Sequence, residues 1–133
     1  EKHLCQMVRV IPGIKEKLKQ FKDAGHQIIW LTAPWKQSQT WCYDRTIWIE
    51  RHFGDISKNV IYASHKEDVP GDILIDDNPE NLRKWKTAHP DGEAILFRQP
   101  WNVFESMSFI SGWDDSKLDT YIVMAMGKRW NNK

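Results

Sequence analysis

The sequence is poor in cysteine, in long apolar runs and in net charge, and each shortage excludes a class of protein. Its 133 residues contain two cysteines, Cys5 and Cys42, without the spacing of a zinc site or a disulfide framework, so we expect both to be reduced. No apolar run approaches the roughly 18 to 20 residues that cross a bilayer, and no secretory pattern begins the chain, which predicts a cytoplasmic protein without a membrane partner. The 19 basic and 18 acidic residues leave a net charge of +1, which argues against an extended nucleic acid as partner.

The composition is instead that of a small globular domain. Apolar residues make up 41% of the chain, and eight tryptophans supply large side chains for a core. The chain begins at Glu1 rather than at Met and reaches a helical pattern by Ile14, which we interpret as a piece of a longer protein. We therefore expect one α/β domain over residues 1–133, incomplete at its N-terminus.

Helical and strand patterns alternate along the chain. Ile14, Leu18 and Phe21 have helical spacing, and Asn78 followed by Pro79 is typical of a helix start. The patterns predict helices at about 14–24, 38–53, 79–88 and from about 115, and strands at 27–32, 59–63, 72–75 and 94–97. This alternation favours an open, mostly parallel sheet, which binds its ligands at the carboxyl ends of its strands.

Two adjacent carboxylates follow the apolar run at residues 73–75. Asp76 and Asp77 repel each other unless a cation or a proton intervenes, and Mg²⁺ often binds one or two carboxylates together with phosphate and water. The other interpretation is a turn whose carboxylates cap the next helix. A second pair, Asp114 and Asp115, follows no buried strand, and we interpret it as a helix N-terminus.

Three further side chains have both a chemical and a structural interpretation. Thr32 and the backbone N–H groups that follow it, beginning with Ala33, could donate to an anion, or Thr32 could simply end its strand. Lys66 could neutralise a phosphoryl oxygen, although a lone lysine is normally an exposed surface residue, and the same holds for Lys36. His65 is a candidate general base, but nothing in the sequence places it near the carboxylates.

Taken together, these residues resemble a known family. Residues 31–34, Lys66 and residues 72–79 are similar in order and spacing to the second, third and fourth motifs of the haloacid dehalogenase-like phosphatase superfamily. Residues 41–54 are similar to a helix of the 5'(3')-deoxyribonucleotidases. The resemblance spans about residues 11–102.

The resemblance implies a Rossmann-like haloacid dehalogenase-type core and a Mg²⁺-dependent phosphomonoesterase that acts on nucleoside monophosphates or other small phosphate esters. It implies that Thr32, Ala33 and Lys36 bind the phosphate and that Lys66 stabilises both the phosphate and the nucleophile. Under the same resemblance Asp76 would bind Mg²⁺ directly, and Asp77 would act through water or through an outer shell of ligands. These last assignments are expectations from the family pattern.

The sequence departs from this family at the first motif, because no Asp-x-Asp occurs in the 133 residues. In the family that motif supplies the nucleophile on a strand between those that end here at Thr32 and Asp77, and the family's small cap is missing as well. Three explanations are open: an upstream segment carries the motif, residues 4–10 replace the strand without its aspartates, or another chain, such as a second copy, supplies it. We favour the first, because the connection from residue 10 to the helix at Ile14 is short for a parallel crossover. The alternative function is a non-catalytic protein that binds a nucleotide, a phosphate or a protein partner.

Overall fold

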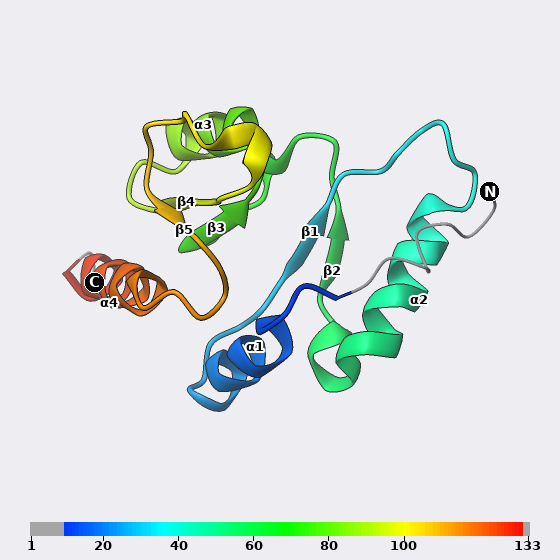
Figure 1. Ribbon diagram of the computed structural model, residues 1–133, viewed down its shortest axis with the longest axis horizontal. Coiled ribbons are helices and arrows are strands. Elements are labelled where there is room, and N and C mark those ends of the chain that lie inside the picture. Colours follow the sequence, from blue (N-terminus) through cyan, green and yellow to red (C-terminus); the bar gives the residue numbers. More distant parts are fainter. Residues whose placement is uncertain (1–9, 132–133) are drawn as a thin grey trace. The chain divides into compact units, whose positions relative to one another are not determined.

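The computed structural model describes residues 10–131, with side chains described through residue 128. The chain divides into two compact units, one ending at Ser64 and the other beginning at His65, and each is described by itself (Figure 1). The sequence-based expectation of a single domain stays a prediction. The segment proposed as a replacement strand, residues 4–10, lies outside the described residues except for Val10.

The first unit pairs two short parallel strands and packs helices against them. Its elements are α1 (Ile14–Asp23), β1 (Trp30–Thr32), α2 (Trp41–Phe53), a 3-10 turn η2 (Gly54–Ser57) and β2 (Val60–Tyr62). In the β1–β2 ladder Leu31 lies opposite Ile61. The core of this unit consists of Leu18 from α1 and Trp48, Ile49 and Phe53 from α2.

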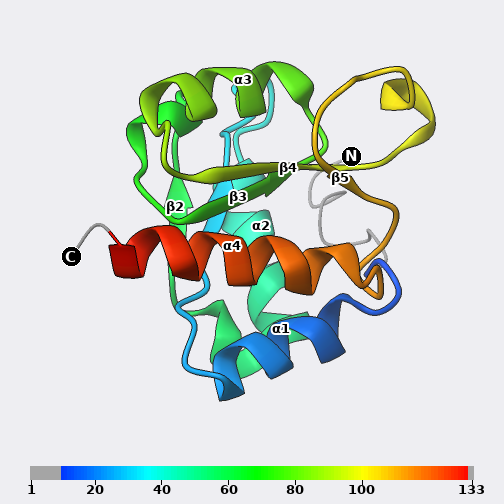
Figure 2. The same ribbon diagram turned by 90° about the vertical axis from the view of Figure 1, so that its left-hand side faces the viewer.

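The second unit is a three-stranded parallel sheet with the order β3-β4-β5. Its elements are η3 (Lys66–Asp68), β3 (Ile73–Asp76), α3 (Pro79–Ala88), β4 (Glu93–Phe97), η4 (Pro100–Asn102), β5 (Phe109–Ile110) and α4 (Lys117–Asn131). Figure 2 shows α3 and α4 on opposite sides of this sheet. Leu82 and Trp85 from α3, together with Leu118 from α4, are almost completely buried.

Trp85 fixes the local packing of α3 against the segments on either side of it. Its indole Nε1 donates a hydrogen bond to the carbonyl oxygen of Val69 at 3.0 Å. Gly92 lies against the same ring, because a Cβ atom there would be 2.5 Å from Cη2 of Trp85. The turn between α3 and β4 therefore requires glycine at this position.

The predicted α/β class with parallel strands is confirmed, with small differences at the element ends. The first strand begins at Trp30 rather than at residue 27, and α2 begins at Trp41 rather than at residue 38. Within the described residues β1 has a ladder only with β2, and β3 only with β4.

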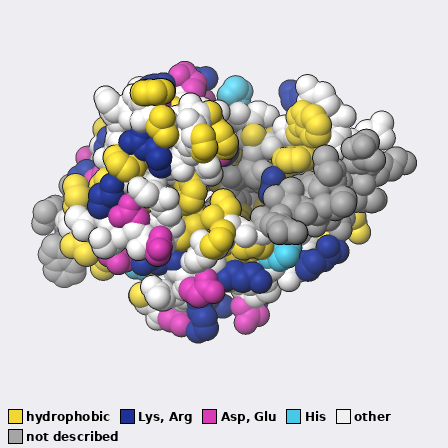
Figure 3. Space-filling model, in the orientation of Figure 1, with side chains coloured by type: hydrophobic (Ala, Val, Ile, Leu, Met, Phe, Trp, Pro, Cys, Tyr) yellow, Lys and Arg dark blue, Asp and Glu magenta, His cyan; other side chains and the backbone are white. Residues whose placement is uncertain are grey.

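Two surface properties bear on the choice of partner. Acidic and basic side chains lie interspersed on the face drawn in Figure 3, as expected for a net charge of +1. Among the helices that the structure describes, none has the length and apolar character needed to cross a bilayer.

Candidate functional site

The carboxyl end of β3 holds a buried ion pair. Asp76 Oδ2 accepts a hydrogen bond from Lys66 Nζ at 2.8 Å and one from Asn81 Nδ2 at 3.2 Å. Asp76 Oδ1 accepts a third from the backbone N–H of Asn78 at 3.0 Å. The side chains of Lys66 and Asp76 are 14% and 7% exposed. The structure thus brings together two of the residues that the sequence pointed to, Lys66 from η3 and Asp76 from β3.

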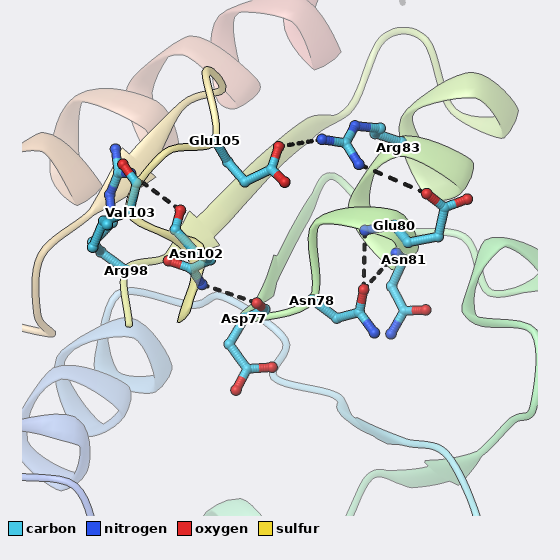
Figure 4. A network of polar contacts seen from close by, with 9 residues as sticks. All are labelled: Asp77, Asn78, Glu80, Asn81, Arg83, Arg98, Asn102, Val103 and Glu105. Atoms are coloured by element: carbon cyan, nitrogen blue, oxygen red, sulfur yellow. Dashed lines mark hydrogen bonds and ion pairs between the residues drawn. The ribbon is translucent and has the colours of Figure 1, made fainter. Parts of the chain in front are cut away.

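The start of α3 explains why this geometry forms. The side chain of Asn78 caps the helix, its Oδ1 accepting from the backbone N–H groups of Glu80 at 2.9 Å and Asn81 at 3.3 Å (Figure 4). Pro79 occupies the first turn, where its missing N–H costs no helical hydrogen bond. The cap confirms the predicted helix start and holds Asn81 within reach of Asp76. The carboxylate therefore lies at a helix N-terminus, where negative charge is favoured.

The two adjacent carboxyl groups differ in their electrostatics. Burial alone raises the pKa of Asp76, but the hydrogen bond and charge of Lys66, with the hydrogen bonds from Asn78 and Asn81, bring that pKa below its ordinary value. Burial and the neighbouring Asp76 raise the pKa of Asp77. The surroundings of Asp76 therefore favour its ionised form, whereas those of Asp77 disfavour it.

The two adjacent carboxyl groups are hard oxygen donors, the kind of ligand that Mg²⁺ prefers. Within the described residues no group of three or more His, Cys, Asp or Glu side chains could hold a metal by itself. Mg²⁺ is commonly bound through one or two carboxylates, with substrate phosphate and water completing its octahedron. Asp76 and Asp77 could supply two such carboxylates, and Oδ1 of Asp76 accepts from the Asn78 N–H.

The remaining phosphate-site candidates lie in the first unit. Thr32 ends β1, and its carbonyl accepts from the Ala63 N–H at 3.0 Å. The carbonyl of Ala33 accepts from Trp41 Nε1 at 3.1 Å, which ties the turn after β1 to the start of α2. Lys36 is exposed. The grouping of Thr32, Ala33 and Lys36 with the Lys66–Asp76 pair stays a prediction.

Two other sequence-based interpretations can be compared with the structure. Asp115 caps the start of α4, as predicted: its carboxylate accepts from the backbone N–H groups of Ser111 at 2.8 Å and Lys117 at 3.0 Å, which lowers its pKa. His65 is an exposed loop residue whose Nδ1 lies 3.6 Å from a carboxylate oxygen of Glu67.

Sequence reasoning missed two asparagines at the site. Asn81 was recoverable, because it lies one turn into a helix whose cap was recognised. Asn102, whose Nδ2 donates to the carbonyl oxygen of Asp77 at 3.0 Å, is 25 positions away and has no local signal.

Comparisons with known proteins find a family of nucleotidases. Residues 1–126 match the model of the family described as "5' nucleotidase, deoxy (Pyrimidine), cytosolic type C protein". The mitochondrial 5'(3')-deoxyribonucleotidase of Mus musculus is 32% identical over 89 residues, which are 65% of this chain and 40% of that protein. A putative 5'(3')-deoxyribonucleotidase of Staphylococcus epidermidis is 28% identical over 110 residues, covering 81% of this chain and 58% of the relative. The 5'(3')-deoxyribonucleotidase of Clostridium acetobutylicum is 42% identical over 66 residues, 49% of this chain and 34% of the relative. The chain thus spans about one third to three fifths of the length of these relatives.

Proposed function

Because the chain belongs to the family of 5' nucleotidase, deoxy (pyrimidine), cytosolic type C proteins, we propose that it forms the metal- and phosphate-binding part of a nucleotidase. The reaction is the Mg²⁺-dependent hydrolysis of (deoxy)nucleoside monophosphates. The observation that carries this proposal is the buried Lys66–Asp76 pair with Asp77 beside it at the end of β3. The relatives named 5'(3')-deoxyribonucleotidase support the substrate class.

The residues of the β3 end have distinct roles in this proposal. Asp76 would hold Mg²⁺ directly and Asp77 indirectly, and the ion would supply positive charge to the phosphate oxygens. Lys66 has three N–H donors and gives one to Asp76, so donors remain for a phosphate oxygen. The same bond keeps the ammonium group in place, because both side chains are nearly buried.

The residues that follow β1 in the first unit are the other phosphate-binding candidates of this proposal. Thr32 donates its hydroxyl group, and the backbone N–H of Ala33 and the ammonium group of Lys36 add further donors. Such N–H and hydroxyl donors at the end of a parallel strand are common in phosphate sites. The expected partner is a nucleoside monophosphate or a similar small phosphate ester, and neither an extended nucleic acid nor a membrane.

Phosphate release from deoxynucleoside monophosphates by the native protein tests this proposal. We expect release to require Mg²⁺ and to be lost in Asp76→Asn, because the variant removes a carboxylate without changing the shape of the side chain. Asp91→Asn, an exposed acidic residue of the same unit, is the matched control and should retain full activity. Full activity in Asp76→Asn would overturn the proposal.

A non-catalytic role is the second candidate, because no Asp-x-Asp occurs in the 133 residues. In the catalytic case the nucleophile comes from a further segment or from a second chain, including a second copy of this one. In the non-catalytic case the native protein binds a nucleotide in a Mg²⁺-linked manner without turnover. Equilibrium nucleotide binding measured beside phosphate release distinguishes the two.

The proposed compartment is the cytoplasm, which the word "cytosolic" in the family description supports. Cell fractionation tests this directly. Recovery in mitochondria, the location in the name of the mouse relative, would contradict it.

A further inference from the structure

Asn102 uses its whole side-chain amide to join three segments of the second unit. Its Nδ2 donates to the carbonyl oxygens of Asp77 at 3.0 Å and Phe97 at 3.1 Å, and its Oδ1 accepts from the Gln99 N–H at 2.8 Å. The residue is only 3% exposed. A buried amide with two donors and its acceptor engaged fixes the backbone around it, since breaking any of these bonds leaves a polar group unsatisfied.

The position of Asn102 relative to the β3–β4 ladder is informative. The ladder ends where Asp76 lies opposite Leu96. Asn102 then bonds the next residue of each strand, Asp77 and Phe97, and so continues the connection one step beyond the ladder. The peptide that carries the second carboxylate is therefore held to β4 by a side chain rather than by a strand.

The loop that carries Asn102 is itself anchored. The guanidinium group of Arg98 donates to the carbonyl oxygens of Asn102, at 3.3 Å, and of Val103. At the far side of the loop Glu105 pairs with Arg83 of α3. Figure 4 shows these contacts in one view with Asp77. The loop is thus attached both to β4 and to the helix that begins at the carboxylate pair.

We propose that Asn102 is a positioning residue for the metal-binding carboxylates. By fixing the Asp77 peptide it presents the carboxylates of Asp76 and Asp77 together, although Asn102 touches neither metal nor substrate. This inference rests on the proposed function, because it assumes that the pair binds Mg²⁺. Loss of such an outer partner typically weakens metal affinity about 10- to 100-fold.

The test measures Mg²⁺ affinity by isothermal titration of the native protein, with Mg²⁺ alone as the ligand. Asn102→Ala removes all three bonds, whereas Asn102→Asp keeps the shape and the acceptor for Gln99 but turns an oxygen toward two carbonyl groups. We expect both to weaken Mg²⁺ binding about tenfold or more. We also expect the Mg²⁺ concentration that gives half-maximal phosphate release to rise. The factor of this rise should exceed the factor by which kcat falls at saturating Mg²⁺.

Two controls separate positioning from other effects. Leu118→Ala removes a completely buried side chain from α4 of the same unit and should lower stability while leaving Mg²⁺ affinity unchanged. Asp76→Asn should abolish Mg²⁺ binding. Circular dichroism establishes that each variant is folded, and Asn102→Asp preserves the test if Asn102→Ala does not fold.

The outcomes distinguish this inference from the proposed function. Unchanged Mg²⁺ affinity in Asp76→Asn would show that Asp76 is not part of a metal site and would overturn the proposed function. A second outcome is that Asp76→Asn binds Mg²⁺ more weakly, while a folded Asn102 variant keeps a Mg²⁺ affinity within twofold of the parent. This result would overturn the positioning role and leave the proposed metal site intact. Equal weakening in Leu118→Ala would also overturn it, because the effect would then follow general stability.

Discussion

The buried Lys66–Asp76 pair predicts a large loss of stability when only the cation is removed. Lys66→Met keeps the length of the side chain but leaves the carboxylate, 7% exposed, without its countercharge. Removing one partner of a buried pair typically costs about 3 to 5 kcal/mol. The Asn78 N–H and the Asn81 amide still bond to Asp76, so we expect the lower end, about 3 kcal/mol at pH 7.

The pH dependence of this loss has a definite sign. In the parent the pKa of Asp76 lies below its ordinary value, because Lys66 and the hydrogen bonds outweigh burial. Its stabilising contribution is therefore present above the unfolded pKa of about 3.9 and lost as pH falls through the folded pKa. Without Lys66 the burial of Asp76 makes its ionisation unfavourable. The difference between Lys66→Met and the parent should thus be largest at pH 7 and small near pH 2.

The assay must report on the second unit, because the chain forms two compact units. Native-state hydrogen exchange of the β3 amides gives the opening free energy of that unit, and urea unfolding at pH 2 and pH 7 gives the pH dependence. Lys19→Met is the matched control: its Nζ also lies 2.8 Å from an aspartate, Asp23, but the side chains are 75% and 62% exposed. We expect no measurable change there. The reasoning would be refuted if Lys66→Met lowered the free energy of unfolding by less than about 1 kcal/mol, or by the same amount at both pH values.

Three other substitutions test separate features of the second unit. Asn78→Ala removes the cap of α3 and should lower the free energy of unfolding by about 1 kcal/mol in urea, whereas an unchanged midpoint would contradict the capping role. Gly92→Ala places a Cβ 2.5 Å from Cη2 of Trp85, and overpacking of this kind costs about 1 to 3 kcal/mol, so the melting temperature should fall. Asp77→Asn should raise the melting temperature of the metal-free protein at pH 7 but not at pH 2. Burial and the charge of Asp76 raise the pKa of Asp77, so its ionisation destabilises the fold as pH rises above the unfolded value.

Local signals in the sequence predicted parts of both units. Asn78 with Pro79 marked the start of α3, and the helical spacing of Ile14, Leu18 and Phe21 marked α1. These signals succeed because capping and amphipathic periodicity depend on residues within one or two turns. The buried run at 73–75, followed by two aspartates, likewise placed the candidate site at the end of β3.

Element ends that depend on distant partners were less predictable. The apolar run from residue 27 suggested a longer first strand, but its ladder partner β2 has only three residues, Val60–Tyr62, so β1 is equally short. β5 was missed because two residues, Phe109–Ile110, are too few to show alternation. Helix α2 begins late because Thr40, not Ser38, precedes its first turn and donates its hydroxyl to Asp44 at 2.8 Å.

The candidate site shows the same limit. The sequence suggested Lys66 and Asp76 separately, and each had an ordinary surface interpretation until the structure joined them at 2.8 Å. Asn102 reaches Asp77 across 25 positions, and no local pattern distinguishes it from any other loop asparagine. Contacts of this kind depend on how β3 and β4 pair, which is a property of the whole unit.

The adjacent carboxylates are supported unequally, and that difference bears on function. Asp76 receives three hydrogen bonds and a countercharge, whereas the pKa of Asp77 is raised by burial and by Asp76 itself. A turn needed only to cap α3 has no use for a second carboxylate, since Asn78 already fills that role. The raised pKa of Asp77 predicts that its ionised form lowers the stability of this unit at pH 7. Under the proposed function, a divalent cation shared by both groups would offset their repulsion.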